Sequence, residues 1–223
     1  MNTKAQNLFI AKLIPKQERE ERAITSWHIS KLGSCLTGTY LERMGEKPDE
    51  EFDERTLRVF DVGKMFEQWL LEQIKKDTRF EITEQARVEG SGFSGYIDAL
   101  VTIKKTKEIV PIEIKSKHSK AFWYMTKQGK PMRQHEYQLW MYMYLTGYPL
   151  GKLVYISKDD NAVQEFFVKL NDKALEKEVI TEIDILNKAW ETKTPPVPII
   201  DPKDWRYKYC RWHKHCLKLH GRG

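Results

Sequence analysis

The chain alternates between segments whose apolar residues recur every three or four positions and short runs rich in β-branched and aromatic residues. The first pattern favours helices, and the second favours strands. We predict helices near residues 16–24, 28–44, 54–76, 119–127, 132–146 and 171–192. We predict strands near residues 80–89, 93–103, 109–116, 152–157 and 163–169.

The order of these elements predicts a single α/β domain over residues 1–223. We expect a mixed central β-sheet flanked by helices, with helical N- and C-terminal elements that meet beside it. The core covers about residues 54–170, between N-terminal helices in residues 1–53 and a C-terminal segment, residues 171–223. The helix over residues 54–76 has an apolar stripe at helical spacing. Its buried face is expected to consist of Leu57, Phe60, Met65, Trp69 and Leu70.

Candidate chemistry lies on two neighbouring strands. Asp98 stands in the second predicted strand, and Glu113 and Lys115 stand two apart on the third. Because side chains alternate along a strand, Glu113 and Lys115 point to the same side. Two carboxylates and an ammonium group that converge on one point can bind a divalent cation beside a positive charge. The alternative is that these charges form an ordinary solvated face of the sheet.

A polar pair marks the helix over residues 132–146, which contains neither proline nor glycine. Gln138 and Tyr142 lie four apart, so they share one face of that helix. We expect both side chains to face the charged strands. The alternative is that Tyr142, in a run of aromatic residues and methionines, belongs to the core.

The ordered set of Gly-x-x-Asp at Asp98, Glu-x-Lys at Glu113 and Gln-x3-Tyr at Gln138 resembles the PD-(D/E)XK nuclease superfamily. It is most similar to the RecB-like branch, which includes CRISPR-associated adaptation nucleases. The resemblance implies a restriction-endonuclease-like core. It also implies that Asp98, Glu113 and the backbone carbonyl of Ile114 bind Mg²⁺ or Mn²⁺, and that Lys115 assists the attacking water. The Gln-x3-Tyr helix would contact the substrate strand.

A further motif of the same branch resembles Gly63-Lys64-Met65-Phe66-Glu67, although the family usually has a His where this chain has Glu67. A carboxylate is a harder ligand than imidazole and suits Mg²⁺ at least as well. The resemblance therefore implies that Glu67 is another metal ligand, with a changed metal preference. The alternative is that Glu67 is an exposed helix acid.

The charge distribution indicates a nucleic-acid partner more clearly than the total charge, which is only +6. No acidic residue lies between Ile114 and His135, whereas lysines are frequent there and surround the aromatic run Phe122-Trp123-Tyr124. Cations with aromatic faces suit a single strand, whose phosphates are neutralised and whose bases stack. The alternative for the aromatic residues is burial beneath a basic helix. The candidate DNA-binding residues are Lys117, Lys120, Trp123, Tyr124, Lys127 and Arg133.

The chain has three cysteines, one near the N-terminus and two near the C-terminus: Cys35, Cys210 and Cys216. This layout resembles the iron-sulfur members of the same branch, in which four cysteines hold a [4Fe-4S] cluster that joins the two ends of the domain. Tyr207 occupies the fourth place here, and four protein ligands are the norm. His213 and His215 offer nitrogen ligands for a mixed site or for zinc. The third alternative is three reduced thiols without metal.

The resemblance implies a metal-dependent DNA exonuclease that acts on DNA ends or single strands, with 5′-to-3′ polarity. One alternative is a structure- or sequence-specific endonuclease of the same fold. Another is a non-catalytic DNA-binding subunit of a recombination or CRISPR adaptation complex. No stretch approaches the roughly 18 apolar residues of a membrane span, and the first residues show no signal-peptide pattern. We therefore expect a soluble, cytoplasmic protein.

Overall fold

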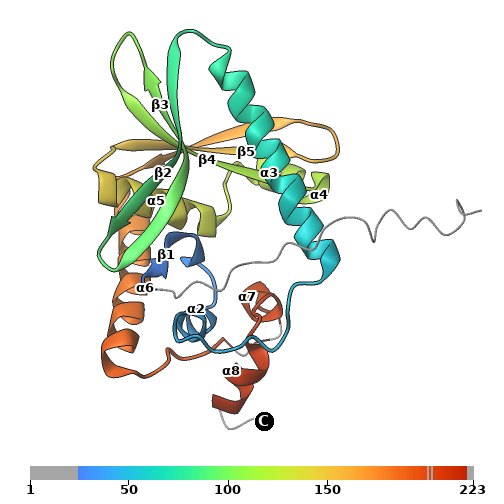
Figure 1. Ribbon diagram of the computed structural model, residues 1–223, viewed down its shortest axis with the longest axis vertical. Helices are drawn as coiled ribbons and strands as arrows, with labels where there is room; N and C mark the ends of the chain where they lie inside the picture. Colours follow the sequence, from blue (N-terminus) through green and yellow to red (C-terminus); the bar gives the residue numbers. More distant parts are fainter. Residues whose placement is uncertain (1–24, 200, 202, 220–223) are drawn as a thin grey trace, which may run out of the picture.

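The computed structural model describes residues 25–199, 201 and 203–219, and in this part of the chain six strands form one mixed sheet (Figure 1). Helices flank the sheet, so the expected fold class is confirmed. The strands are β1 (Trp27–His28), β2 (Phe80–Gly90), β3 (Phe93–Ile103), β4 (Ile109–Lys117), β5 (Leu150–Ser157) and β6 (Val163–Lys169).

The sheet divides where β3 leaves β4. β2 and β3 form a long antiparallel hairpin, but β3 pairs with β4 only from Ala99 to Thr102. The N-terminal part of β3 stays paired with β2 but no longer with β4, and at Phe93 and Ser94 it also pairs with the short β1. On the other side β4 runs parallel to β5, which is antiparallel to β6. We call the place where β3 and β4 separate, between Asp98 and Ile114, the β3–β4 fork.

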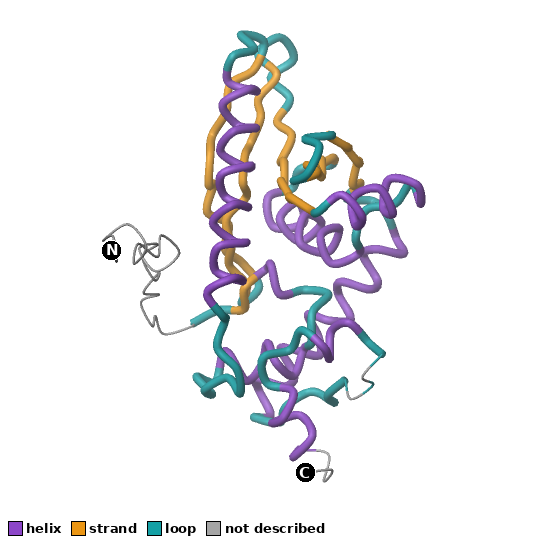
Figure 2. Tube along the Cα trace, turned by 90° about the vertical axis from the view of Figure 1, so that its right-hand side faces the viewer, coloured by secondary structure: helices purple, strands orange, loops and turns teal. Residues whose placement is uncertain are grey.

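Helices cover both faces of this sheet. α3 (Glu54–Lys75) runs along the β2–β3 hairpin (Figure 2), and Leu71 packs with Ile114 and Val154 in one apolar cluster. α5 (Arg133–Thr146) and α6 (Lys173–Thr192) cover the opposite face, where the larger cluster is formed. The remaining helices are η2 (Ile29–Lys31), α2 (Leu36–Arg43), α4 (Ser119–Gln128), α7 (Trp205–Lys208) and α8 (His213–Leu219).

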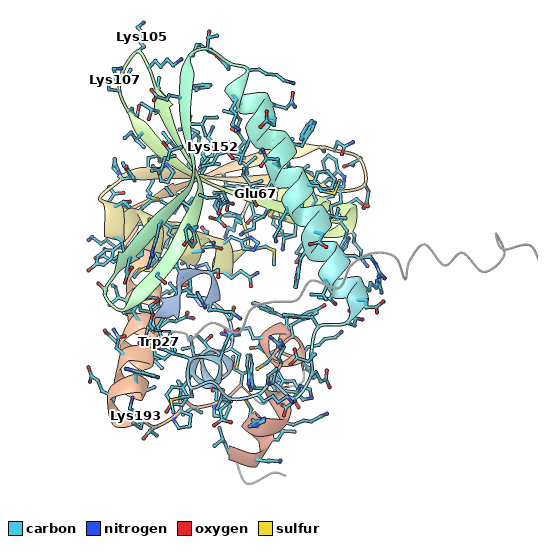
Figure 3. All side chains as sticks on the ribbon, in the orientation of Figure 1. Trp27, Glu67, Lys105, Lys107, Lys152 and Lys193 are labelled. Carbon is cyan, nitrogen blue, oxygen red and sulfur yellow. The ribbon has the colours of Figure 1, made fainter. Side chains whose placement is uncertain are left out.

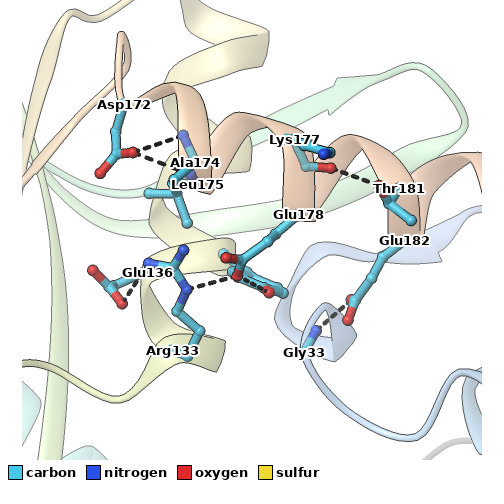
Figure 4. A network of polar contacts seen from close by, with 11 residues as sticks. Gly33, Arg133, Glu136, Asp172, Ala174, Leu175, Lys177, Glu178, Thr181 and Glu182 are labelled. Atoms are coloured by element: carbon cyan, nitrogen blue, oxygen red, sulfur yellow. Dashed lines mark hydrogen bonds and ion pairs between the residues drawn. The ribbon is translucent and has the colours of Figure 1, made fainter.

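Most predicted elements lie within two residues of their expected bounds, but the helix expected over residues 28–44 is wrong. That stretch contains the end of β1, the single turn η2 and the short α2. Gly33 interrupts it with a φ of +76°, a left-handed conformation that favours glycine. A Cβ on Gly33 would lie 2.8 Å from the Cα of Gln134, and Glu182 accepts a hydrogen bond from the Gly33 N–H at 2.7 Å (Figure 4). The helix expected over residues 16–24 lies outside the described residues.

The expected buried face of α3 is wrong except for Leu70, which packs against the apolar cluster beside the buried Leu71. Met65 is 69% exposed and Trp69 is 48% exposed. Of the other expected members, Leu57 is half-buried and Phe60 is exposed. Apolar residues occur around most of this helix, so their spacing does not identify its inner face. The position of the sheet identifies it.

The C-terminal segment packs beside the N-terminal part of the described chain (Figure 1). The indole N–H of Trp212, which precedes α8, donates to the carbonyl of Glu46 at 3.0 Å. Asp49 accepts hydrogen bonds from the backbone N–H groups of Lys214 and His215. None of the helices in the described ranges combines the length and the apolar composition that a membrane crossing requires.

Candidate active site

The three central charged residues meet at the β3–β4 fork. Ile114 lies beyond the last residue pair between β3 and β4, and its N–H donates to Oδ2 of Asp98 at 2.7 Å. Glu113, the preceding residue, is only 1% exposed. Nζ of Lys115 lies 2.5 Å from Oε1 of Glu113. The structure therefore brings together Asp98, Glu113 and Lys115, as strand alternation predicted.

α5 closes the buried side of the fork with the expected polar pair. Nε2 of Gln138 donates to Oε1 of Glu113 at 2.7 Å and lies 3.4 Å from the hydroxyl of Tyr142. Both side chains are buried. A Cβ on Gly95 would lie 2.7 Å from the Tyr142 hydroxyl oxygen, so only glycine leaves room for this ring. The Gly-x-x-Asp and Gln-x3-Tyr motifs are thus in direct contact.

Glu67 reaches the same region from α3, which crosses the sheet there (Figure 3). Oε1 of Glu67 accepts a hydrogen bond from Nε2 of Gln85 on β2 at 2.8 Å. Burial and then the charge of Asp98 raise the pKa of Glu67 to about 7. Glu67 is therefore half-buried and electrostatically coupled to Asp98, which distinguishes it from an ordinary exposed helix acid.

Negative charge is in excess at the fork. Burial raises the pKa of Glu113 to about 8, and Asp98 adds to this effect while Lys115 opposes it. Burial also raises the pKa of Asp98. Oε2 of Glu113 is buried and accepts no hydrogen bond from any described residue. Three carboxylates surround one ammonium group, so the arrangement is suited to a positively charged ligand.

Four of the candidate DNA-binding residues lie on α4, and Lys117 is the last residue of β4 just before it. Lys120 and Lys127 are exposed, and Trp123 and Tyr124 are 50% and 69% exposed. The indole N–H of Trp123 donates to Asp160 at 2.9 Å, which holds the ring on the surface. Lys117 is half-buried, and burial together with the charges of Lys115 and Lys158 lowers its pKa to about 8. The neighbouring Phe122, in contrast, belongs to the core.

Arg133 has protein partners. Its Nε donates to Glu178 of α6 at 2.8 Å, and its Nη1 lies 3.2 Å from Glu136 (Figure 4). The hydroxyl of Tyr137 donates to the same Glu178 at 2.5 Å. These contacts join α5 to α6 and thereby help to place Gln138.

Sequence reasoning missed Gln85, which donates to Glu67 from β2. Its backbone has a φ of +49° inside a strand, an uncommon conformation for a residue other than glycine. No glycine, proline or motif residue marks this position, so the sequence contained no signal for it. The steric role of Gly95 was missed as well, although the spacing of Gly95 and Asp98 was recognised.

The three cysteines also converge, in a separate region. Their sulfur atoms all lie within 4.8 Å of one another. Cys35 precedes α2, Cys210 precedes α8 and Cys216 lies within α8. Within the described ranges no His, Asp or Glu joins this group, since Nδ1 of His215 is 2.6 Å from Asp49 and Nδ1 of His213 lies 3.2 Å from the carbonyl of Cys210.

Solved structures share this fold. An alkaline exonuclease (LHK-Exo) from Laribacter hongkongensis superposes with a TM-score of 0.57 at 19% identity, over 77% of this chain and 91% of that chain. LHK-Exo in complex with dAMP gives 0.58 at 20% identity over the same shares, 77% and 91%. The protein SSO0001 gives 0.50 at 18% identity, over 93% of this chain and 89% of that chain. Neither a family model nor a curated protein sequence matches the chain. At these identities the likeness concerns the fold.

Proposed function

We propose that this protein is a metal-dependent nuclease that hydrolyses phosphodiester bonds in DNA. The proposal rests on the convergence of Asp98, Glu113 and Lys115 at the β3–β4 fork, where a buried oxygen of Glu113 lacks a partner among the described residues. The resemblance to the RecB-like branch of the PD-(D/E)XK superfamily implies the same reaction. The fold shared with an alkaline exonuclease supports it.

A divalent cation fits the donor set of the fork. Mg²⁺ and Mn²⁺ prefer oxygen ligands, and Glu67, Asp98 and Glu113 supply carboxylates beside the carbonyl of Ile114. The free Oε2 of Glu113 is an acceptor that is costly to bury unless something binds it. When bound, such a cation lowers the pKa of a coordinated water and polarises the scissile phosphate.

Lys115 acts as a cation in this proposal. Burial lowers its pKa, but Glu113 and Asp98 raise it more, and the net result is a pKa above the ordinary lysine value. Lys115 therefore places a positive charge where negative charge develops on the phosphate in the transition state. Gln138 holds Oε1 of Glu113, so the second oxygen stays available. Tyr142 is buried beside Gln138, and its hydroxyl lies 3.4 Å from Nε2 of Gln138.

The substrate that we propose is a DNA end or a single strand, degraded as an exonuclease would degrade it, with 5′-to-3′ polarity. The exposed Lys120, Trp123, Tyr124 and Lys127 follow the strand that carries Lys115, so a strand leaving the fork would meet cations and aromatic faces. LHK-Exo is an alkaline exonuclease and was solved with dAMP, a mononucleotide.

The test is an end-labelled cleavage assay on linear and covalently closed circular DNA with Mg²⁺ or Mn²⁺. We expect mononucleotide release from linear DNA only, and loss of cleavage in Asp98→Asn. Asp184→Asn is the matched control, because Asp184 is exposed on α6 far along the chain from the fork. Digestion of circles would show an endonuclease instead. If neither wild type nor Asp98→Asn cleaves DNA, with or without metal, the protein is a non-catalytic DNA-binding subunit, such as recombination or CRISPR adaptation complexes require.

We propose further that Cys35, Cys210 and Cys216 bind a metal centre, with a [4Fe-4S] cluster as the form that the resemblance implies. Three thiols within 4.8 Å supply three of the usual four ligands. Hydrogen bonds from Cys210 and Cys216 lower the pKa of Cys35 and favour a thiolate there, whereas the contact with Cys35 raises the pKa of Cys210 and Cys216. Iron, sulfide and zinc analysis of anaerobically purified protein tests the proposal. Three freely titrating thiols in metal-free protein would contradict it.

A further inference from the structure

Gln85 has a backbone conformation that its position in the sheet does not explain. Five residues other than glycine have a positive φ in the described ranges, and four of them lie in turns, loops or at a helix end: Ser91, Lys107, Asn161 and Lys193. Gln85 instead lies in the middle of β2, with a φ of +49°. A left-handed conformation is strained for such a residue and persists only where its surroundings hold it.

The strain changes where side chains point. β2 and β3 keep one register on both sides of Gln85, since Glu84 pairs with Ala99 and Ala86 pairs with Ile97. In a regular strand Glu84 and Gln85 would face opposite sides. Here both reach α3, because Glu84 forms an ion pair with Lys75 and Gln85 bonds to Glu67.

The side chain of Gln85 lies between two carboxylates of the fork. Its Nε2 donates to Oε1 of Glu67 at 2.8 Å, and Gln85 stands opposite Asp98, because Glu84 pairs with Ala99 and Ala86 pairs with Ile97. These two acids repel each other, because each raises the pKa of its neighbours through its charge. The side chain of Gln85 is exposed, so it does not contribute by filling the core.

We infer that Gln85 is a positioning residue, whose amide holds the carboxylates of Glu67 and Asp98 toward a shared divalent cation and whose strained backbone is retained for that purpose. The inference rests on the proposed metal-dependent function and deepens it, because it makes Glu67 a metal ligand. Mutation of a residue that orients a metal ligand by a hydrogen bond typically weakens metal affinity by about 10- to 100-fold.

The test measures Mn²⁺ binding by electron paramagnetic resonance, together with melting temperature, in Gln85→Met and Gln85→Gly. Methionine keeps the length of the side chain without a donor, and glycine relieves the strain. We expect both variants to bind Mn²⁺ roughly tenfold more weakly or worse, while Gln85→Gly melts above wild type. Gln68→Met is the matched control, because Gln68 donates to Glu72 on the outer part of α3 at 3.0 Å. Ser91→Gly controls for relief of strain alone.

The outcomes separate this inference from the proposed function. Wild-type Mn²⁺ affinity in Gln85→Gly overturns the positioning role, whatever Gln85→Met does, because the amide is then dispensable. Asp98→Asn is measured in the same series and is expected to lose Mn²⁺ binding. If Asp98→Asn binds Mn²⁺ like wild type, the metal site itself is wrong and both proposals fail. If only Asp98→Asn is impaired, the proposed function stands without Gln85.

Discussion

Two groups of charged residues in this protein are built in opposite ways. Between α5 and α6, Arg133 pairs with Glu178 and Glu136 near the surface, and its hydrogen bond lowers the pKa of Glu178 (Figure 4). At the β3–β4 fork, burial raises the pKa of Asp98 and Glu113, and a single ammonium group faces three carboxylates. The first group is partly solvated and has two carboxylates around one guanidinium group, whereas the second is buried and has three carboxylates around one ammonium group.

The contrast separates a structural contact from a site. Exposed ion pairs contribute about 1 kcal/mol or less and require nothing further. Buried acids that outnumber the nearby cations have raised pKa values and resist ionisation until a further cation binds, so such a group favours a cationic ligand. Charge alone would not have distinguished the groups, because both contain Glu residues bonded to a cationic side chain.

The largest expected effect on the cleavage rate comes from removing an acid at the fork, and it is compared with the removal of an acid beside Arg133. Glu113→Gln should reduce the cleavage rate by more than about a hundredfold, because the variant loses a ligand of the proposed cation together with its charge. Glu178→Gln should stay within about twofold of wild type, since it lies outside the fork. Single-turnover assays on end-labelled DNA measure both rates. Equal reductions of the cleavage rate in the two variants would contradict the distinction between the two groups.

Neutralising cations on α4 should give the next largest effect. We expect the double variant Lys120→Gln, Lys127→Gln to bind single-stranded DNA about tenfold more weakly and to reduce the salt slope of binding by about two. Lys105→Gln, Lys107→Gln is the matched control, because these lysines lie at the far tip of the β3–β4 connection (Figure 3). Fluorescence anisotropy at several salt concentrations measures the slopes. An unchanged salt slope in the α4 variant would show that these two lysines of α4 do not contact the DNA.

Glu113 at the fork and Glu178 beside Arg133 should respond to pH with opposite signs. The pKa of Glu113 in the folded protein is raised to about 8. Between the ordinary glutamate pKa and pH 8, the metal-free folded protein therefore holds a proton that the unfolded chain has lost, and it loses stability as pH rises through this range. Glu178 has a lowered pKa, so its contribution is lost as pH falls into the acid range.

We expect metal-free wild type to melt at least about 3 °C lower at pH 8 than at pH 6, beyond the change seen in Glu113→Gln. Calorimetry in the presence of a chelator measures the difference, and addition of Mn²⁺ at pH 8 should restore stability. Parallel behaviour of wild type and Glu113→Gln would show that Glu113 is not the titrating group.

The smallest effect should come from Arg133→Gln. Loss of its exposed pairs with Glu178 and Glu136 should lower the free energy of unfolding by about 1 kcal/mol, with little change in the cleavage rate. Urea denaturation measures the stability. The same variant tests the DNA-binding role expected for Arg133, because a direct phosphate contact would also lower the salt slope by about one.

The candidate site was largely predictable because its residues lie on regular elements. Strand alternation placed Glu113 and Lys115 together, and helical spacing placed Gln138 and Tyr142 together. Gln85 was not predictable, because its role depends on a left-handed backbone that no residue type at that position signals. The inner face of α3 was mispredicted for a related reason, since apolar residues occur on more than one side of that helix.

By itself the sequence determined most of the strands and helices between residues 54 and 192, the mixed α/β class, and the few side chains that regular periodicity aligns. Those properties depend on interactions between residues close in the chain, which local spacing records. Only the tertiary structure decided that β3 leaves β4 beside Asp98 and that Glu67 and Gln85 meet across two elements. These contacts join residues far apart in the chain, and their geometry follows from how whole elements pack.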